Sequence, residues 1–198
     1  MSNGKRVEDF SLDALRSGDR AEFARLVDRY YEMIYRLAIK MVNNPQDAED
    51  ILQETFIKAY RHLEKFDGRS SLSTWLYRIA TNEALMFLRR QKPDMISVDE
   101  TLDTGEGDIE PIQVVDWSSL PEDELMSTEA QVYLDKAVEK LSPSLRVVFV
   151  LRDIQNLSTR ETAEVLNISE TAVKTRLSRA RLQLREELTS YYGERVRA

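Results

Sequence analysis

The chain has 198 residues, 42% of them hydrophobic, which suits one or two domains with a real core and argues against wholesale disorder. It has no cysteine, one histidine (His62) and no glycine-rich phosphate loop, so thiol chemistry is excluded and an enzyme is not expected. The net charge of −7 is uneven: twelve acids and one lysine between Gln91 and Val132 carry −11, so the remainder carries +4.

The first residues, MSNGKRVEDF, lack the apolar segment of a signal peptide, and no apolar run approaches the roughly 20 residues of a membrane-spanning helix. We therefore expect a cytoplasmic protein that needs no metal and no cofactor. Apolar residues at helical spacing from Ala21 to Ile39 predict a helix that begins at Ser17 or Asp19. The run Asn43-Asn44-Pro45 predicts its end, because proline disfavours helix in the residue before it.

The next helix, Asp47 to Tyr60, has two different faces. Apolar residues from Ala48 to Leu63 recur at i, i+3 and i+4 and predict a core face. The opposite side is charged, yet it includes Ile57. An apolar residue in a charged stripe is weak evidence of a partner surface, and a solvated face with one stray isoleucine is the alternative.

A turn is predicted from Phe66 to Ser71, after which Ser73 or Thr74 is expected to cap a third helix that ends near Arg90. Residues 92–127 lack periodicity and have the composition of a linker, although Trp117 suggests that part of the segment docks. Helical periodicity returns at Thr128.

The C-terminal segment predicts a helix-turn-helix. Ser158 and Glu161 form a capping box, Asn167 to Ser169 a turn, and Ser169 a cap for the last helix. Between Thr171 and Arg185 this helix has five cations and no acid, opposite a buried stripe of Val173, Leu177, Ala180 and Leu184. Such a basic face is typical of DNA binding, and an ordinary charged solvent face is the alternative. No strand is predicted, so the fold class is all-α.

Three segments also resemble one known family. DAEDILQETFIKAY (Asp47 to Tyr60), STWLYRIATNEALMFLRR (Ser73 to Arg90) and LSTRETAEVLNISETAVKTRLSRARLQLREEL (Leu157 to Leu188) resemble, in order and spacing, the extracytoplasmic-function sigma factors of bacterial RNA polymerase. The resemblance implies sigma domain 2 (residues 1–92), an acidic linker (93–127) and sigma domain 4 with its helix-turn-helix (128–198). It implies promoter-specific transcription initiation in a stress or envelope-signal response.

The resemblance also implies partners and site residues. The partners are core RNA polymerase, through its beta-prime clamp helices and beta flap, promoter DNA, and an anti-sigma factor. The implied polymerase contacts are Asp50, Gln53, Glu54 and Ile57. The minus-ten element, once its strands separate, is held by the loop Phe66 to Ser73, with Phe66, Arg69, Ser70 and Ser71, and by Asn82 of the RIATN segment. Leu85 and Met86 are apolar where many relatives have a polar residue.

The last helix is implied to read the minus-thirty-five element. Five of its residues point away from the predicted core, namely Thr171, Lys174, Thr175, Ser178 and Arg179, and Arg176 matches a phosphate contact. Ser178 stands where some relatives have an aromatic residue. Two other classes of function remain open: a helix-turn-helix regulator that acts without joining polymerase, and a helical adaptor that does not contact DNA.

Overall fold

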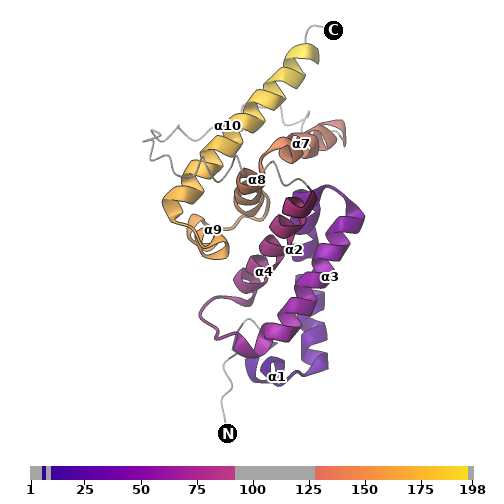
Figure 1. The fold of residues 1–198 in the computed structure, drawn as a ribbon, viewed down its shortest axis with the longest axis vertical. Helices are drawn as coiled ribbons and strands as arrows, with labels where there is room; N and C mark the ends of the chain where they lie inside the picture. The colour runs from indigo at the N-terminus through magenta and orange to yellow at the C-terminus, as the bar shows by residue number, and fades with distance from the viewer. Residues whose placement is uncertain (1–5, 8–9, 92–127, 196–198) are drawn as a thin grey trace.

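The computed structural model describes residues 6–7, 10–91 and 128–195, which are almost entirely helical (Figure 1). The predicted all-α fold is confirmed, with a small exception near the N-terminus. The acidic segment, with the predicted linker and Trp117, lies outside the described residues. In chain order the elements are β1 (Arg6–Val7), β2 (Phe10–Ser11), α1 (Leu12–Arg16), α2 (Arg20–Val42), α3 (Pro45–His62), η1 (Leu63–Lys65), α4 (Leu72–Gln91), α7 (Thr128–Lys140), α8 (Pro143–Phe149), η3 (Val150–Ile154), α9 (Thr159–Leu166) and α10 (Glu170–Arg195).

Helices α2, α3 and α4 lie side by side and form the N-terminal bundle (Figure 1). Each contributes one apolar face to a shared core, and burying a Leu, Ile or Phe side chain contributes about 1.5–3 kcal/mol. The buried residues include Leu26, Ile34, Leu37 and Met41 from α2, Ala48, Ile51, Leu52 and Phe56 from α3, and Leu72, Leu76, Ala80 and Ala84 from α4.

The junction between α2 and α3 is determined by local sequence. Asn43 adopts the left-handed conformation (φ 52°), which ends α2, and its N–H donates to the Ile39 carbonyl. Asn44 then caps α3, its side chain accepting hydrogen bonds from the N–H groups of the second and third helical residues, and Pro45 occupies the first position. The predicted break is confirmed.

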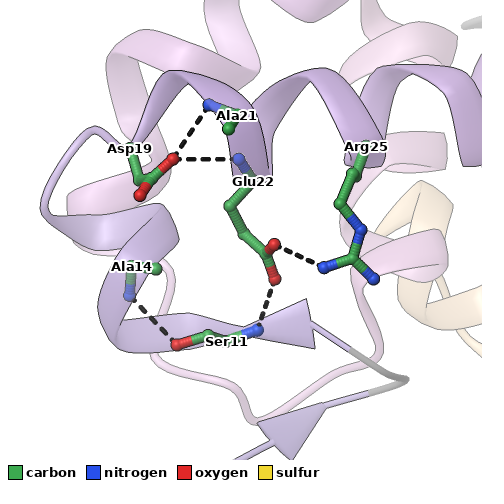
Figure 2. A network of polar contacts seen from close by, with 6 residues as sticks. All are labelled: Ser11, Ala14, Asp19, Ala21, Glu22 and Arg25. Carbon is green, nitrogen blue, oxygen red and sulfur yellow. Dashed lines mark hydrogen bonds and ion pairs between the residues drawn. The ribbon is translucent and has the colours of Figure 1, made fainter.

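The segment before α2 is fastened to that helix by polar contacts (Figure 2). Asp19 caps α2, as predicted, and accepts from the Ala21 and Glu22 N–H groups at 2.8 and 3.0 Å. The Glu22 carboxylate accepts from the Ser11 N–H at 2.8 Å and pairs with Arg25 at 2.6 Å. The prediction of no strands was wrong here, because β1 and β2 pair as an antiparallel two-residue ladder.

The C-terminal helices start and stop largely where the sequence predicts. Ser158 and Glu161 form the capping box that begins α9, and the hydrogen bonds from Ser158 hold the pKa of the Glu161 carboxyl below its usual value. Asn167 (φ 54°) ends α9 in the left-handed conformation. Ser169 Oγ accepts from the Ala172 N–H at 3.1 Å and caps α10. Between α8 and α9 the chain makes a π-helical turn, η3.

The two halves of the chain pack against each other, with α9 against α4 and α7 against the end of α2 (Figure 1). Arg146 of α8 is 5% exposed, and its guanidinium donates to the Met41 carbonyl of α2 at 2.5 Å and to the Glu139 and Leu141 carbonyls. These acceptors lie at the C-terminal ends of α2 and α7, where helix dipoles favour a cation. Burial lowers the pKa of the Arg146 guanidinium.

Candidate functional site

The outward face of α3 displays the four residues expected to contact polymerase. Asp50 and Gln53 are exposed, Glu54 is partly exposed, and Ile57 is 43% exposed, whereas Ile51 on the opposite face is 3% exposed. Because these four positions are spaced i, i+3, i+4 and i+7, they form one stripe along the helix. The core does not use the Ile57 side chain, which leaves an apolar contact site within a polar surface.

Lys58 ties this stripe to α4. Its ammonium group lies 3.6 Å from the Glu54 carboxylate and 2.6 Å from that of Glu83. The positive charge is therefore shared between two carboxylates, and the exposed end of the stripe stays acidic. Opposite charges at i and i+4 also stabilise the helix itself.

The loop before α4 has a buried first residue and an exposed centre. The Phe66 side chain is 3% exposed, and its ring centroid lies 5.1 Å from that of Trp75. Phe66 is among the residues expected from the sequence to hold the separated strand, whereas in this structure its ring packs in the core. Arg69, by contrast, has a side chain 90% exposed and pairs with Asp67 at 2.9 Å.

The cap of α4 also differs from the prediction. Ser71 Oγ accepts from the Thr74 N–H at 3.0 Å and lies 2.8 Å from the hydroxyl oxygens of both Ser73 and Thr74. Ser71, rather than Ser73 or Thr74, is thus the capping residue. Its hydroxyl closes the loop at the end opposite to Phe66.

Asn82 lies on the exposed side of α4, one turn after Arg78 and one turn before Met86. Met86 is 39% exposed, so the apolar residue noted in the sequence is at the surface. Arg78, which the site prediction left out, belongs to the same stripe. Arg78 and Asn82 are four residues apart, at the two ends of the RIATN segment, so helical spacing alone could have placed Arg78 beside Asn82.

The start of this stripe, together with the neighbouring Tyr77, contacts the C-terminal half. Arg78 Nη2 donates to the Glu164 carbonyl of α9 at 2.8 Å, and the Tyr77 hydroxyl donates to Gln155 Oε1 at 2.9 Å. Burial raises the pKa of Tyr77 to about 12, with smaller opposing effects of Arg36 and Glu161. The tyrosine therefore remains a neutral hydrogen-bond donor at every physiological pH.

Helix α10 has the predicted buried stripe of Val173, Leu177, Ala180 and Leu184. On its outward side, Thr171 and Lys174 are exposed, and Thr175, Arg176, Ser178 and Arg179 are half-buried. The helix therefore presents several hydroxyl and cationic groups in one region. A helix that enters a DNA groove needs such groups to contact bases and phosphates.

One of the five cations between Thr171 and Arg185 serves the fold. Arg181 donates to both carboxylate oxygens of Asp153, from Nη2 at 2.7 Å and from Nε at 2.9 Å, and this hydrogen bonding raises the pKa of Arg181. A bidentate pair fixes orientation as well as distance. Arg181, which is not among the residues expected to point outward, therefore holds α10 against η3.

The structure places these residues in three separate regions: the α3 stripe, the loop with the exposed side of α4, and the outward side of α10. It does not gather them into one cleft. Among the described residues, no three histidine, cysteine, aspartate or glutamate side chains lie together as a metal site would require. None of the helices in the described residues is both long and apolar enough to cross a membrane.

Comparison with known proteins covers nearly all of the chain. Residues 26–93 match the family model of Sigma-70 region 2, and residues 131–184 match that of Sigma-70, region 4. The ECF RNA polymerase sigma factor SigW of Bacillus subtilis is 42% identical over 177 residues, which span 89% of this chain and 94% of the relative. The ECF RNA polymerase sigma-E factor of Escherichia coli K12 is 35% identical, over 86% and 88% respectively.

Solved structures show the same fold. CnrH, in its complex with the cytosolic domain of CnrY, superposes with a TM-score of 0.64 at 24% identity and covers 90% of this chain and 95% of its own. The sigma factor RpoE of Bartonella quintana, in complex with the anti-sigma factor NepR, gives 0.60 at 24% identity, over 85% and 97%. One chain that matches both Sigma-70 regions, with a sigma-factor relative that spans 89% of it, does not fit a regulator that acts without polymerase or an adaptor that does not contact DNA. The chain belongs to the ECF RNA polymerase sigma factors, DNA-binding factors that direct promoter-specific transcription initiation and are not known enzymes.

Proposed function

We propose that the three regions divide the work of initiation. Residues 1–92, as sigma domain 2, bind core polymerase and hold the minus-ten element, and residues 128–198, as sigma domain 4, read the minus-thirty-five element. The acidic segment 93–127 connects them. The observation that carries this proposal is the α3 stripe, because a 43% exposed isoleucine among carboxylates has no role in the fold of the bundle.

In the polymerase contact, Asp50, Gln53, Glu54 and Ile57 meet the beta-prime clamp helices. Carboxylates at the edge of the stripe favour a basic partner surface and speed its approach. The exposed Ile57 side chain supplies the apolar centre that stable interfaces need. Lys58 keeps Glu54 oriented by the shared ion pairs.

In strand capture, the Asn82 amide donates to and accepts from the edge of a base that has left the stack. Its exposure on α4 and the nearby loop support this role. Arg69, Ser70 and Ser71 line the loop, with Arg69 exposed enough to reach a phosphate. Phe66 supports the loop from the core.

In the reading of duplex DNA, α10 enters the major groove. Lys174, Thr175, Ser178 and Arg179 face the bases, with Thr171 at the helix entrance, and Arg176 contacts a phosphate. Arginine can form two hydrogen bonds to one guanine. A serine or threonine hydroxyl can donate or accept a hydrogen bond, so it can contact different bases. The pairing of Arg181 with Asp153 supports this assignment, because it fixes the helix that carries the readers.

The partners of this sigma factor include, beside polymerase and promoter DNA, an anti-sigma factor. Two similar folds were solved in complexes, one with the cytosolic domain of CnrY and one with the anti-sigma factor NepR. Because its partner polymerase transcribes chromosomal DNA, we propose that the protein works in the cytoplasm. Neither a metal nor a cofactor enters the proposed function.

A promoter-dependent run-off transcription assay with core polymerase tests the proposal. Wild-type protein should produce transcripts from a cognate promoter, and DNA binding by the isolated protein should be weak. A regulator acting without polymerase would instead bind its site tightly by itself. A chain that gave no specific transcript with any promoter fragment from its own genome would contradict the proposed function.

A further inference from the structure

Helix α1 lies outside the match to Sigma-70 region 2, which begins at residue 26. It nevertheless contacts the loop before α4. Arg16, the last residue of α1, donates to the Phe66 carbonyl with two groups, Nε at 3.0 Å and Nη2 at 2.5 Å. The two residues are 50 positions apart in the sequence, so this contact depends on the fold.

Helix α1 also lies close to the middle of the loop. Gly68 has φ +74°, a conformation that glycine adopts without strain, and a Cβ there would lie 3.5 Å from Leu12 Cδ1. Leu12 is the first residue of α1 and is 2% exposed. The loop backbone therefore runs along α1 at both Phe66 and Gly68.

Helix α1 is itself held firmly. Ser11 caps it, its Oγ accepting from the Ala14 N–H at 3.3 Å, and the Ser11 N–H donates to Glu22 of α2 (Figure 2). Asp19, the cap of α2, donates its own N–H to the Ala14 carbonyl at 3.0 Å. A rigid chain of contacts thus leads from the start of α2 through α1 to Arg16 and the loop.

We propose that Arg16 is a positioning residue of the strand-capture loop, and that α1 extends the promoter-melting apparatus beyond region 2. This inference rests on the proposed role of the loop and Asn82. The guanidinium fastens the loop at the Phe66 carbonyl, while the Ser71 cap fastens its other end. With both ends held, the exposed centre keeps one shape before the separated strand arrives, which lowers the ordering cost of capture.

The experiment compares Arg16→Ala, Arg16→Lys and the matched control Arg20→Ala in full-length protein with core polymerase. Arg20 is an exposed arginine on the first turn of α2, so its loss controls for a change of charge. Open complexes are measured by permanganate reactivity of bubble thymines. Losing hydrogen bonds from a charged donor should reduce them about five- to tenfold in Arg16→Ala. Arg16→Lys keeps the positive charge but lacks the planar guanidinium with its two parallel donors. It should therefore form more open complexes than Arg16→Ala but fewer than wild type.

Two further readouts separate positioning from general stability. The ratio of open complexes on promoters that differ at the captured base should approach one in Arg16→Ala, while affinity for core polymerase stays at the wild-type value. The chain has two tryptophans, so Trp117→Phe leaves Trp75 as the single reporter, packed on Phe66. Its emission should change in Arg16→Ala and not in Arg20→Ala.

Asn82→Ala in the same assay distinguishes this inference from the function on which it rests. If Asn82→Ala loses open complexes and Arg16→Ala does not, the positioning role is wrong and strand capture stands. If Arg16→Ala loses them and Asn82→Ala does not, the loop is positioned as proposed but Asn82 does not hold the base. Wild-type behaviour of both variants overturns both ideas. Should Arg16→Ala fold poorly, Arg16→Met, which keeps an aliphatic stem but has no donor for the Phe66 carbonyl, replaces it with the same expectations.

Discussion

The packing of α9 against α4 leads to a prediction about the shape of the working protein. The two promoter elements lie about 25 base pairs apart, which is about 85 Å along a duplex at about 3.4 Å per step. In the structure, Arg78 of α4 touches the Glu164 carbonyl of α9 at 2.8 Å. Arg179 is fifteen positions after Glu164, and Asn82 is one turn after Arg78. Helix rise and chain reach therefore keep Asn82 within about 50 Å of Arg179.

If Asn82 and Arg179 contact the two elements as proposed, the packed arrangement cannot reach both at once, and we expect the two halves to separate on the promoter. Residues 92–127 are long enough to allow this, since an extended chain covers about 3.3 Å per residue, or about 120 Å for the segment. A cross-link between α4 and α9 should therefore abolish promoter-specific transcription. The chain contains no cysteine, so Arg78→Cys with Glu164→Cys provides the only two thiols for a cleavable bismaleimide.

Run-off transcription with core polymerase is the assay, before and after the cross-linker is cleaved. Transcription should be lost on cross-linking and should return on cleavage to the level of the uncross-linked double variant. Arg160→Cys with Glu164→Cys, one turn apart on α9, is the matched control, because it carries the same reagent without joining the halves. Full transcription by the α4–α9 cross-linked protein would refute the reasoning.

Four other outcomes are expected. Glu54→Lys should weaken binding to core polymerase without lowering the melting temperature, and unchanged affinity would remove the α3 stripe from the interface. Asn82→Ala should bind polymerase normally but form few open complexes by permanganate footprinting, even though alanine is the better helix former. Arg179→Ala should relax selectivity at one upstream base pair by about 1–3 kcal/mol. Arg176→Ala should instead weaken binding to every promoter sequence and lower the slope of log affinity against log salt concentration by about one. Titration of promoter variants measures both effects. Arg146→Ala should lower the free energy of unfolding by about 3 kcal/mol in urea titration, because three carbonyls lose a buried donor, and a loss near zero would contradict that account.

What the sequence alone determined about this protein is mostly local. The break between α2 and α3 and the capping box of α9 each depend on residues within four positions of one another, so periodicity and cap chemistry were sufficient, although α3 begins at Pro45, two residues before the predicted Asp47. The buried and outward stripes of α3 and α10 follow from the helical repeat in the same way. The identity of the family came from the residues on those stripes and in the turn.

Only the tertiary structure decided the roles of residues that act across the chain. Arg16 holds the Phe66 carbonyl, Arg181 pairs with Asp153, and Arg146 reaches the end of α2, over separations of 50, 28 and 105 positions. An arginine on a helix surface looks the same in sequence whether it faces DNA, a carboxylate or a backbone carbonyl. Phe66 likewise belongs to a loop expected to hold the separated strand, yet packing against Trp75 places its ring in the core. Such partners are selected by how the helices pack, since side chains distant in sequence meet only after the core has formed.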